Sequence, residues 1–331
     1  MCTLLEAVIK ELKEAGITPD DDGAFYPYDG NALEPYFDAF FQWGQEFIDS
    51  KGPELKIEPA RLFFNSDARI NACAYVDKGY YLIEVNQGTI VNLYSRFFYA
   101  DHLFDDPKIK LYRDLALRFK QAPGFLIFQD ICLMFLYHEA GHLVQRSGLE
   151  KERYSEYLSQ RCAGSQVPIR HIRELDADWF SANHFAHSIL EFSQMESAGV
   201  RLSSSEFENL AALLLSSVYL FFISNCEGRE IYFEKECHPH PAVRLAFFSF
   251  ITLETLQNLV SLPLNKQQIH LDAKMIAETI LHGEGISVMP FYDHLIEHNA
   301  HTIQRYIGKI MTDTKDYPYT SWRVLGGDAQ T

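Results

Sequence analysis

The stretch "FLYHEAGHLVQ", Phe135 to Gln145, places three titratable side chains inside an otherwise apolar run. Between residues 126 and 145 apolar side chains surround the helical period almost completely, which predicts a buried helix at the centre of the fold. Positions i and i+4 of a helix lie on the same face, so His138 and His142 can present their imidazoles to one point. Glu139 points about 100° away from His138, close to that point without being aimed at it.

Two imidazoles from one helical turn are typical ligands of zinc, and a catalytic zinc ion needs a third protein ligand and one open position. The downstream stretch "RELDADWFSANH" offers Glu174 and Asp178, which are again i and i+4 on a predicted helix. Glu174 could complete the ligand set, and Asp178 could accept the far N–H of a ligand histidine. We therefore predict one Zn²⁺ ion held by His138, His142 and Glu174. Glu139 is then placed to take a proton from a water molecule that the metal activates.

A second stretch, "HLIEH" from His294 to His298, carries the reversed H-x-x-E-H pattern and competes with the first. No glutamate follows His298 in the chain, so this motif has no Glu ligand on its C-terminal side. We therefore interpret His294, His298 and His301 as one face of a surface helix.

The rest of the pattern predicts an α+β fold: a small antiparallel sheet packed on a mostly helical body, with the HExxH helix at its centre. Three short β-prone runs follow two predicted helices, and Asp-Lys-Gly between the last two runs predicts a hairpin turn. The expected strands are 61–65, 71–76 and 80–86. After an N-terminal helix and a helix over 31–50, the expected helices are 89–100, 108–121, 125–146, 150–162, 170–197, 204–225, 241–261, 272–282 and 288–310.

We divide the chain into an N-terminal helical region, 1–55, a metallopeptidase-like core, 56–262, and a C-terminal helical extension and tail, 263–331. No linker of Pro, Gly and Ser separates these parts, so we expect them to form one compact unit.

Charge and apolar runs exclude several partners. The net charge of −16 argues against a nucleic acid, whose phosphates would be repelled. Residues 209–226 carry no charge and could pass for a membrane span, but acids rather than Lys or Arg flank them. Ser203 followed by Glu206 is a capping box that opens a helix, so we expect a buried helix and no membrane span.

The N-terminal sequence and the cysteines favour a cytoplasmic protein. Acidic residues interrupt the first helix, which therefore does not resemble a signal peptide. The six cysteines include no C-x-x-C pair, which suggests reduced thiols.

The motif His138-Glu139-Ala140-Gly141-His142, followed by Glu174-Leu-Asp-Ala-Asp178, resembles the gluzincin metallopeptidases. The E-x-x-A-D form is most similar to the CaaX-prenyl-protease and HtpX-like group. His238-Pro239, four residues and Arg244 resemble the late His-Pro…Arg segment of that group. Together with a weaker likeness in the strand region, the resemblance covers the chain from about 60 to 250.

The chain also departs from that group. It lacks the multiple spans of the membrane-bound members, and the interval between His142 and Glu174 is too short for a membrane hairpin. In "NACAY", Asn71 to Tyr75, Cys73 stands where the group has an aromatic residue. A soluble relative fits better, and Lit-type phage-exclusion peptidases are one such possibility.

The resemblance implies a zincin-like fold and hydrolysis of a peptide bond in a protein or peptide substrate. Glu139 would pass the proton of the attacking water to the leaving amine. His238 is the first candidate to stabilise the oxyanion, ahead of His240, Arg244 and Tyr137. Arg244 and Asp178 would support the site.

An extended substrate could pair with a free edge strand near the zinc helix. We expect Ala72, Cys73 and Ala74 to line this strand, because small side chains let a substrate chain come close. An ordinary core strand is the alternative interpretation of the same residues.

Three other functions stay open. A catalytically inactive relative could bind zinc for structure or for a partner, its site closed by Cys237, His238 or His184. An aminopeptidase or a self-processing enzyme would use the same chemistry. A helical interaction protein could carry the motif by accident. Cys237 itself is most simply a structural thiol.

Overall fold

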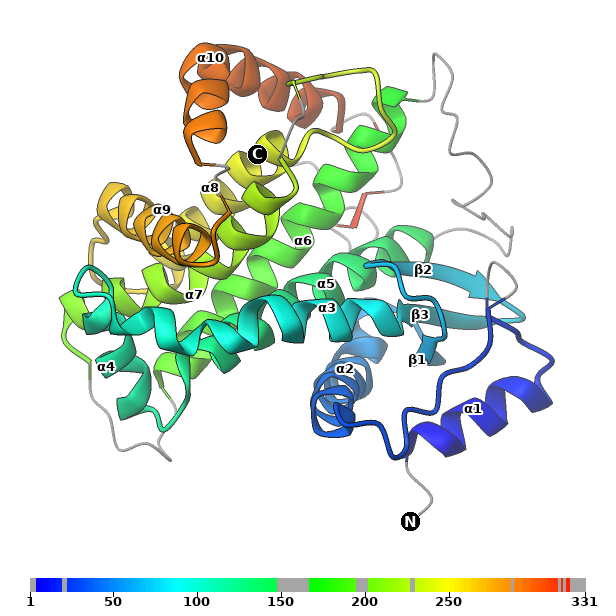
Figure 1. Cartoon of the computed structure of the whole chain (residues 1–331). Coiled ribbons are helices and arrows are strands. Elements are labelled where there is room, and N and C mark those ends of the chain that lie inside the picture. Colours follow the sequence, from blue (N-terminus) through cyan, green and yellow to red (C-terminus); the bar gives the residue numbers. More distant parts are fainter. Residues whose placement is uncertain are drawn as a thin grey trace.

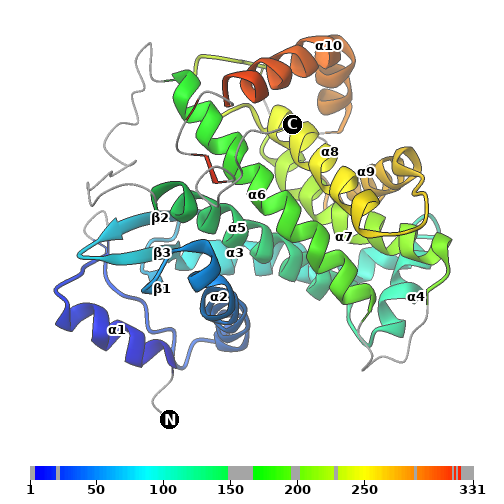
Figure 2. The same cartoon turned by 180° about the vertical axis from the view of Figure 1, so that it is seen from behind.

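The computed structural model describes residues 4–19, 23–147, 167–194, 202–226, 230–286, 289–314, 317, 320 and 321. Figures 1 and 2 show a mostly helical molecule with a small sheet at one end and α4 and α9 at the other. Two long helices, α5 (Pro123–Ser147) and α6 (Val167–Ser193), run between these ends. The predicted α+β composition is therefore confirmed.

The sheet contains β1 (Ala60–Asn65), β2 (Ala72–Asp77) and β3 (Tyr80–Asn86) in the order β1-β3-β2. The strands β2 and β3 pair antiparallel through a tight turn in which Lys78 and Gly79 both have positive φ, which confirms the predicted hairpin. The strand β1 pairs parallel with β3. The sheet is thus mixed, and the prediction of an antiparallel sheet is wrong, because β2 lies beyond β3 rather than between β1 and β3.

The helices before the sheet are α1 (Leu4–Glu14) and α2 (Glu34–Leu55). Those after it are α3 (Gln87–Phe97), the 3-10 helix η1 (Phe98–Asp105) and α4 (Lys110–Arg118), then α5 and α6. The last four are α7 (Ser204–Ser224), α8 (Pro241–Leu259), α9 (Lys266–Gly283) and α10 (Met289–Thr314). The predicted helix over 150–162 lies outside the described residues.

The helix α5 is buried on nearly all sides, as its apolar sequence predicts. It packs against α6, α7 and α2, and against β2 of the sheet. The buried apolar core extends without a break from Leu5 in α1 to Ile310 in α10. The motif of α5 therefore lies deep in the fold, where water has limited access.

The helix α7 has the length and apolarity of a membrane span, but 72% of that apolar window is buried inside the fold. Ser203 and Glu206 form the predicted capping box at its start. Its neighbours are α9, α5 and α8. This environment fits a core helix.

Candidate metal centre

A close approach between α5 and α6 builds the site. A Cβ atom added at Gly141 would lie 3.1 Å from the Cα of Ala177 and 3.2 Å from the Cβ of Phe180. Ser181 on α6 also donates a hydrogen bond of 2.9 Å to the carbonyl of Met134 on α5. Glycine therefore lets α6 approach near enough for Glu174 to meet the two histidines of α5.

We expect Gly141→Ala to destabilise the protein by about 1–3 kcal/mol, because the added methyl group overpacks the contact between α5 and α6. Gly308→Ala on α10 is the matched control, since nothing lies within 4 Å of its added Cβ. The control should be neutral or stabilising by up to about 1 kcal/mol. Urea denaturation of both variants measures the difference, and equal stabilities would contradict the close contact at Gly141.

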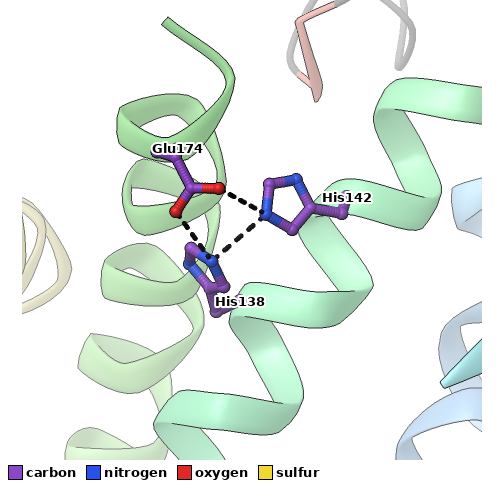
Figure 3. Close-up of side chains that lie close together, drawn as sticks. All are labelled: His138, His142 and Glu174. Atoms are coloured by element: carbon purple, nitrogen blue, oxygen red, sulfur yellow. Dashed lines mark hydrogen bonds and ion pairs between the residues drawn. The ribbon is translucent and has the colours of Figure 1, made fainter. Parts of the chain in front are cut away.

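Three side chains converge between the two helices, as Figure 3 shows. The Nε2 atoms of His138 and His142 are 3.2 Å apart. Glu174 places Oε2 3.6 Å from the Nε2 of His138, and Oε1 3.5 Å from the Nε2 of His142. Ligands at 2.0–2.1 Å from a tetrahedral zinc ion are separated by about 3.4 Å, so this spacing fits zinc. The described residues thus bring together the three predicted ligands in a cluster that could bind a metal ion.

The outer nitrogens of both histidines are held by oxygen atoms. Asp178 Oδ1 lies 3.0 Å from Nδ1 of His138, and Gln145 Oε1 lies 3.1 Å from Nδ1 of His142. Because each oxygen accepts, each Nδ1 carries the hydrogen and donates, which turns both Nε2 lone pairs toward Glu174. Two lone pairs and a carboxylate then face one another, and a cation between them would neutralise their repulsion.

Asp178 is held in turn by Arg244 of α8. The guanidinium donates from Nε to Oδ2 at 2.8 Å and from Nη2 to Oδ1 at 2.7 Å. Burial would raise the pKa of Asp178, but Arg244 and His138 outweigh it and lower the pKa below its ordinary value. Arg244 also places Nη1 3.5 Å from Oε2 of Glu174. Asp178, which ends the E-x-x-A-D motif, and Arg244, which ends the His-Pro…Arg segment, thus both lie at the site.

Glu174 is itself kept ionised although its side chain is only 9% exposed. Burial would raise its pKa, but the charge of His238 and the hydrogen bond that His238 donates lower it well below the ordinary value. An ionised carboxylate is the form that binds a metal ion.

His238 lies at the rim of the cluster. Its Nδ1 is 3.1 Å from Oε2 of Glu174, while 67% of its side chain is exposed. The charge of Glu174 raises the pKa of His238. The loop before it is anchored by fully buried His171, which donates from Nε2 to the carbonyl of Glu236 at 2.8 Å and accepts a hydrogen bond from Tyr306. His238 is therefore both fixed at the cluster and open to solvent.

The other candidate oxyanion donors are engaged elsewhere. Fully buried His240 caps α8, accepting at Nδ1 from the backbone N–H of Ala242 at 3.1 Å. The Tyr137 hydroxyl pairs with Ser188 at 2.9 Å. His184, the residue that could close the site as a fourth ligand, packs among aromatic rings, and burial lowers its pKa to about 4. Arg244 and His238 remain as the hydrogen-bond donors beside Glu174.

Cys237 is disulfide-bonded. The expectation of a free structural thiol at this position is therefore wrong, because sequence spacing did not reveal the pairing. A disulfide sulfur is no thiolate, so Cys237 is not available as a fourth metal ligand.

Glu139 is buried, with 6% of its surface exposed. The negative charges of Asp178, Glu174 and Glu139 all raise the pKa of Arg244. Glu139 belongs to the same charged group as the cluster. The position one residue after His138 predicts this placement.

The strand β2 forms an edge of the described sheet and packs against α5. Ala74 is 5% exposed, and Ala72 and Cys73 are half-buried. Arg146, one turn beyond His142 on α5, donates to the carbonyl of Ala74. This bond ties the edge strand to the metal-site helix, a link that sequence spacing did not reveal.

The reversed motif forms no metal cluster in the described part of α10. The rings of His294 and His298 lie 4.1 Å apart, and His298 Nδ1 bonds to the carbonyl of His294 at 2.8 Å. Among the residues described, the cluster of His138, His142 and Glu174 is the one with metal-ligand geometry.

Comparisons of the chain with protein-family models, with curated proteins and with solved structures found no match. The function of this protein is therefore inferred from the geometry of the site and from the motif resemblance.

Proposed function

We propose that this protein is a zinc-dependent peptidase with a gluzincin-type site and a zincin-like fold. The observation that carries the proposal is the inward orientation of both Nε2 lone pairs and of the Glu174 carboxylate, at the edge lengths of a zinc tetrahedron. Three protein ligands leave a fourth corner for solvent, which distinguishes a catalytic site from a closed structural one.

A bound Zn²⁺ ion would act as a Lewis acid on a carbonyl group and would lower the pKa of a water molecule toward neutrality. Glu139 takes the proton from the attacking water and delivers it to the leaving amine. Glu139 is buried and interacts electrostatically with Arg244, which belongs to the site.

His238 donates to the developing oxyanion in this proposal. Its exposed ring stands at the cluster, fixed by the anchored Glu236 carbonyl. A cationic or neutral imidazole N–H aimed at the charge that develops stabilises the transition state. Arg244 keeps Asp178 ionised and so keeps His138 in the metal-binding tautomer.

The proposed substrate is an extended protein or peptide segment that pairs with the edge of β2. The tie between Arg146 and Ala74 fixes this edge to α5, next to His142. Backbone pairing would give affinity, and the small side chains of Ala72 and Cys73 would admit the substrate chain.

Metal removal tests the proposal directly. The purified protein should contain about one zinc ion per chain and cleave casein or a mixed peptide library. Dialysis against a chelator should abolish cleavage, and added Zn²⁺ should restore it. Magnesium serves as the control, because the nitrogen ligands of this site do not suit it. A protein without bound zinc, or cleavage that survives chelation, would refute the proposal.

A further inference from the structure

A buried chain of hydrogen bonds leads from His142 to the C-terminal end of the described protein. Gln145 accepts from His142 at Oε1, and its amide group donates at 2.8 Å to Asp176. Asp176 then accepts from the backbone N–H of Ser321 at 2.7 Å and from the Ser321 hydroxyl at 3.1 Å. Figure 3 shows, in faint red, a described part of the C-terminal segment above His142.

All members of this chain are inside the protein. Gln145 is 2% exposed, Asp176 5%, and Ser321 has no exposed surface. Hydrogen bonds in such surroundings are stronger than at the surface, and an unpaired group is costly. Ser321 therefore cannot leave without stripping two hydrogen bonds from a buried carboxylate.

The chain fixes which way the Gln145 amide faces. Its Nε2 donates both to Asp176 and to the carbonyl of Arg173, at 2.9 Å. A flipped amide would set its oxygen against these two acceptors, so Oε1 must face His142. The imidazole of His142 is thereby held with Nδ1 protonated and Nε2 free for the metal.

We propose that Ser321 is a positioning residue of the metal centre, which acts on His142 through Asp176 and Gln145. The proposal rests on the proposed zinc site. It implies that the docked C-terminal end strengthens zinc binding, and by linkage that zinc strengthens docking of the C-terminal end by the same factor.

Zinc affinity of two shortened chains tests this role. A chain ending at Tyr319 lacks Ser321 and should bind zinc up to about 10-fold more weakly. This is less than the roughly 10- to 100-fold cost of losing a direct outer partner of a ligand histidine, because Gln145 is retained. A chain ending at Trp322 keeps the Ser321 amide and hydroxyl and should bind as the full chain does. Ser321→Thr should also retain affinity, because it keeps both donors.

A double-variant cycle separates positioning from general destabilisation. Gln145→Leu should itself weaken zinc binding by about 10- to 100-fold. If Ser321 acts through Gln145, ending the chain at Tyr319 adds no further loss to Gln145→Leu. A loss of stability alone would instead give additive effects. Circular dichroism of the metal-free variants checks that each one folds.

Hydrogen exchange gives an independent measurement of the same coupling. Zinc should slow exchange of the Ser321 amide by about the factor that truncation costs in affinity. If the full chain binds zinc but the chain ending at Tyr319 binds equally well, the role of Ser321 is refuted and the zinc site stands. If the full chain binds no zinc, the zinc site itself fails.

Discussion

Replacing Glu139 with glutamine is expected to reduce peptide cleavage by about 10²- to 10⁴-fold while the zinc content stays at that of the wild type. Glutamine keeps the size and shape of the side chain but cannot take a proton from water. Glu139 is not among the three clustered ligands, so the metal should remain bound. Cleavage of a quenched-fluorescent peptide and metal analysis of the same sample measure the two effects together.

The reversed motif offers a matched control for this variant. Glu297→Gln makes the same chemical change inside "HLIEH" on α10, where no metal cluster is described. It should leave both cleavage and zinc content unchanged. Equal cleavage by wild type and Glu139→Gln would remove Glu139 from the mechanism, and loss of cleavage in both variants would point to damage that is not specific to the site.

The part of the site that the sequence predicts is the part that depends on local periodicity. The i and i+4 rule alone places His138 with His142 and Glu174 with Asp178, and the structure brings these two pairs together. Gly141 signals the close helix contact, because glycine is the residue that lets another backbone approach. Gln145 lies at i+3 from His142 and could have been found by the same periodicity.

Other features depend on contacts that no local pattern contains. The turn between β2 and β3 is local, so this hairpin could be predicted from the sequence. The parallel pairing of β1 with β3 depends on where the chain returns to the sheet, so it could not. Asp176 and Ser321 are far apart in the sequence, and each alone is an unremarkable polar residue. The Cys237 disulfide could not be predicted either, because the spacing of cysteines does not determine which ones pair.

Removing the carboxylate of Glu174 is expected to weaken zinc binding by more than about 100-fold. Losing an outer partner of a metal ligand costs up to about 100-fold in affinity, and here a direct ligand is lost. In Glu174→Ala the two histidines alone would hold the ion. Cleavage should fall with the metal content and should recover in part at high zinc concentration. Competition with a chromogenic zinc chelator measures the affinity.

Two further variants make the ligand assignment specific. Glu191→Ala removes an exposed carboxylate from the same helix and should bind zinc normally. Glu174→Asp keeps the charge but shortens the side chain by one methylene group, so it should bind with intermediate affinity. The contrast with Glu139→Gln is the decisive one, because that variant should lose cleavage with its metal retained, whereas Glu174→Ala should lose both. A Glu174→Ala protein with full zinc affinity would break the assignment and leave the two imidazoles without their third ligand.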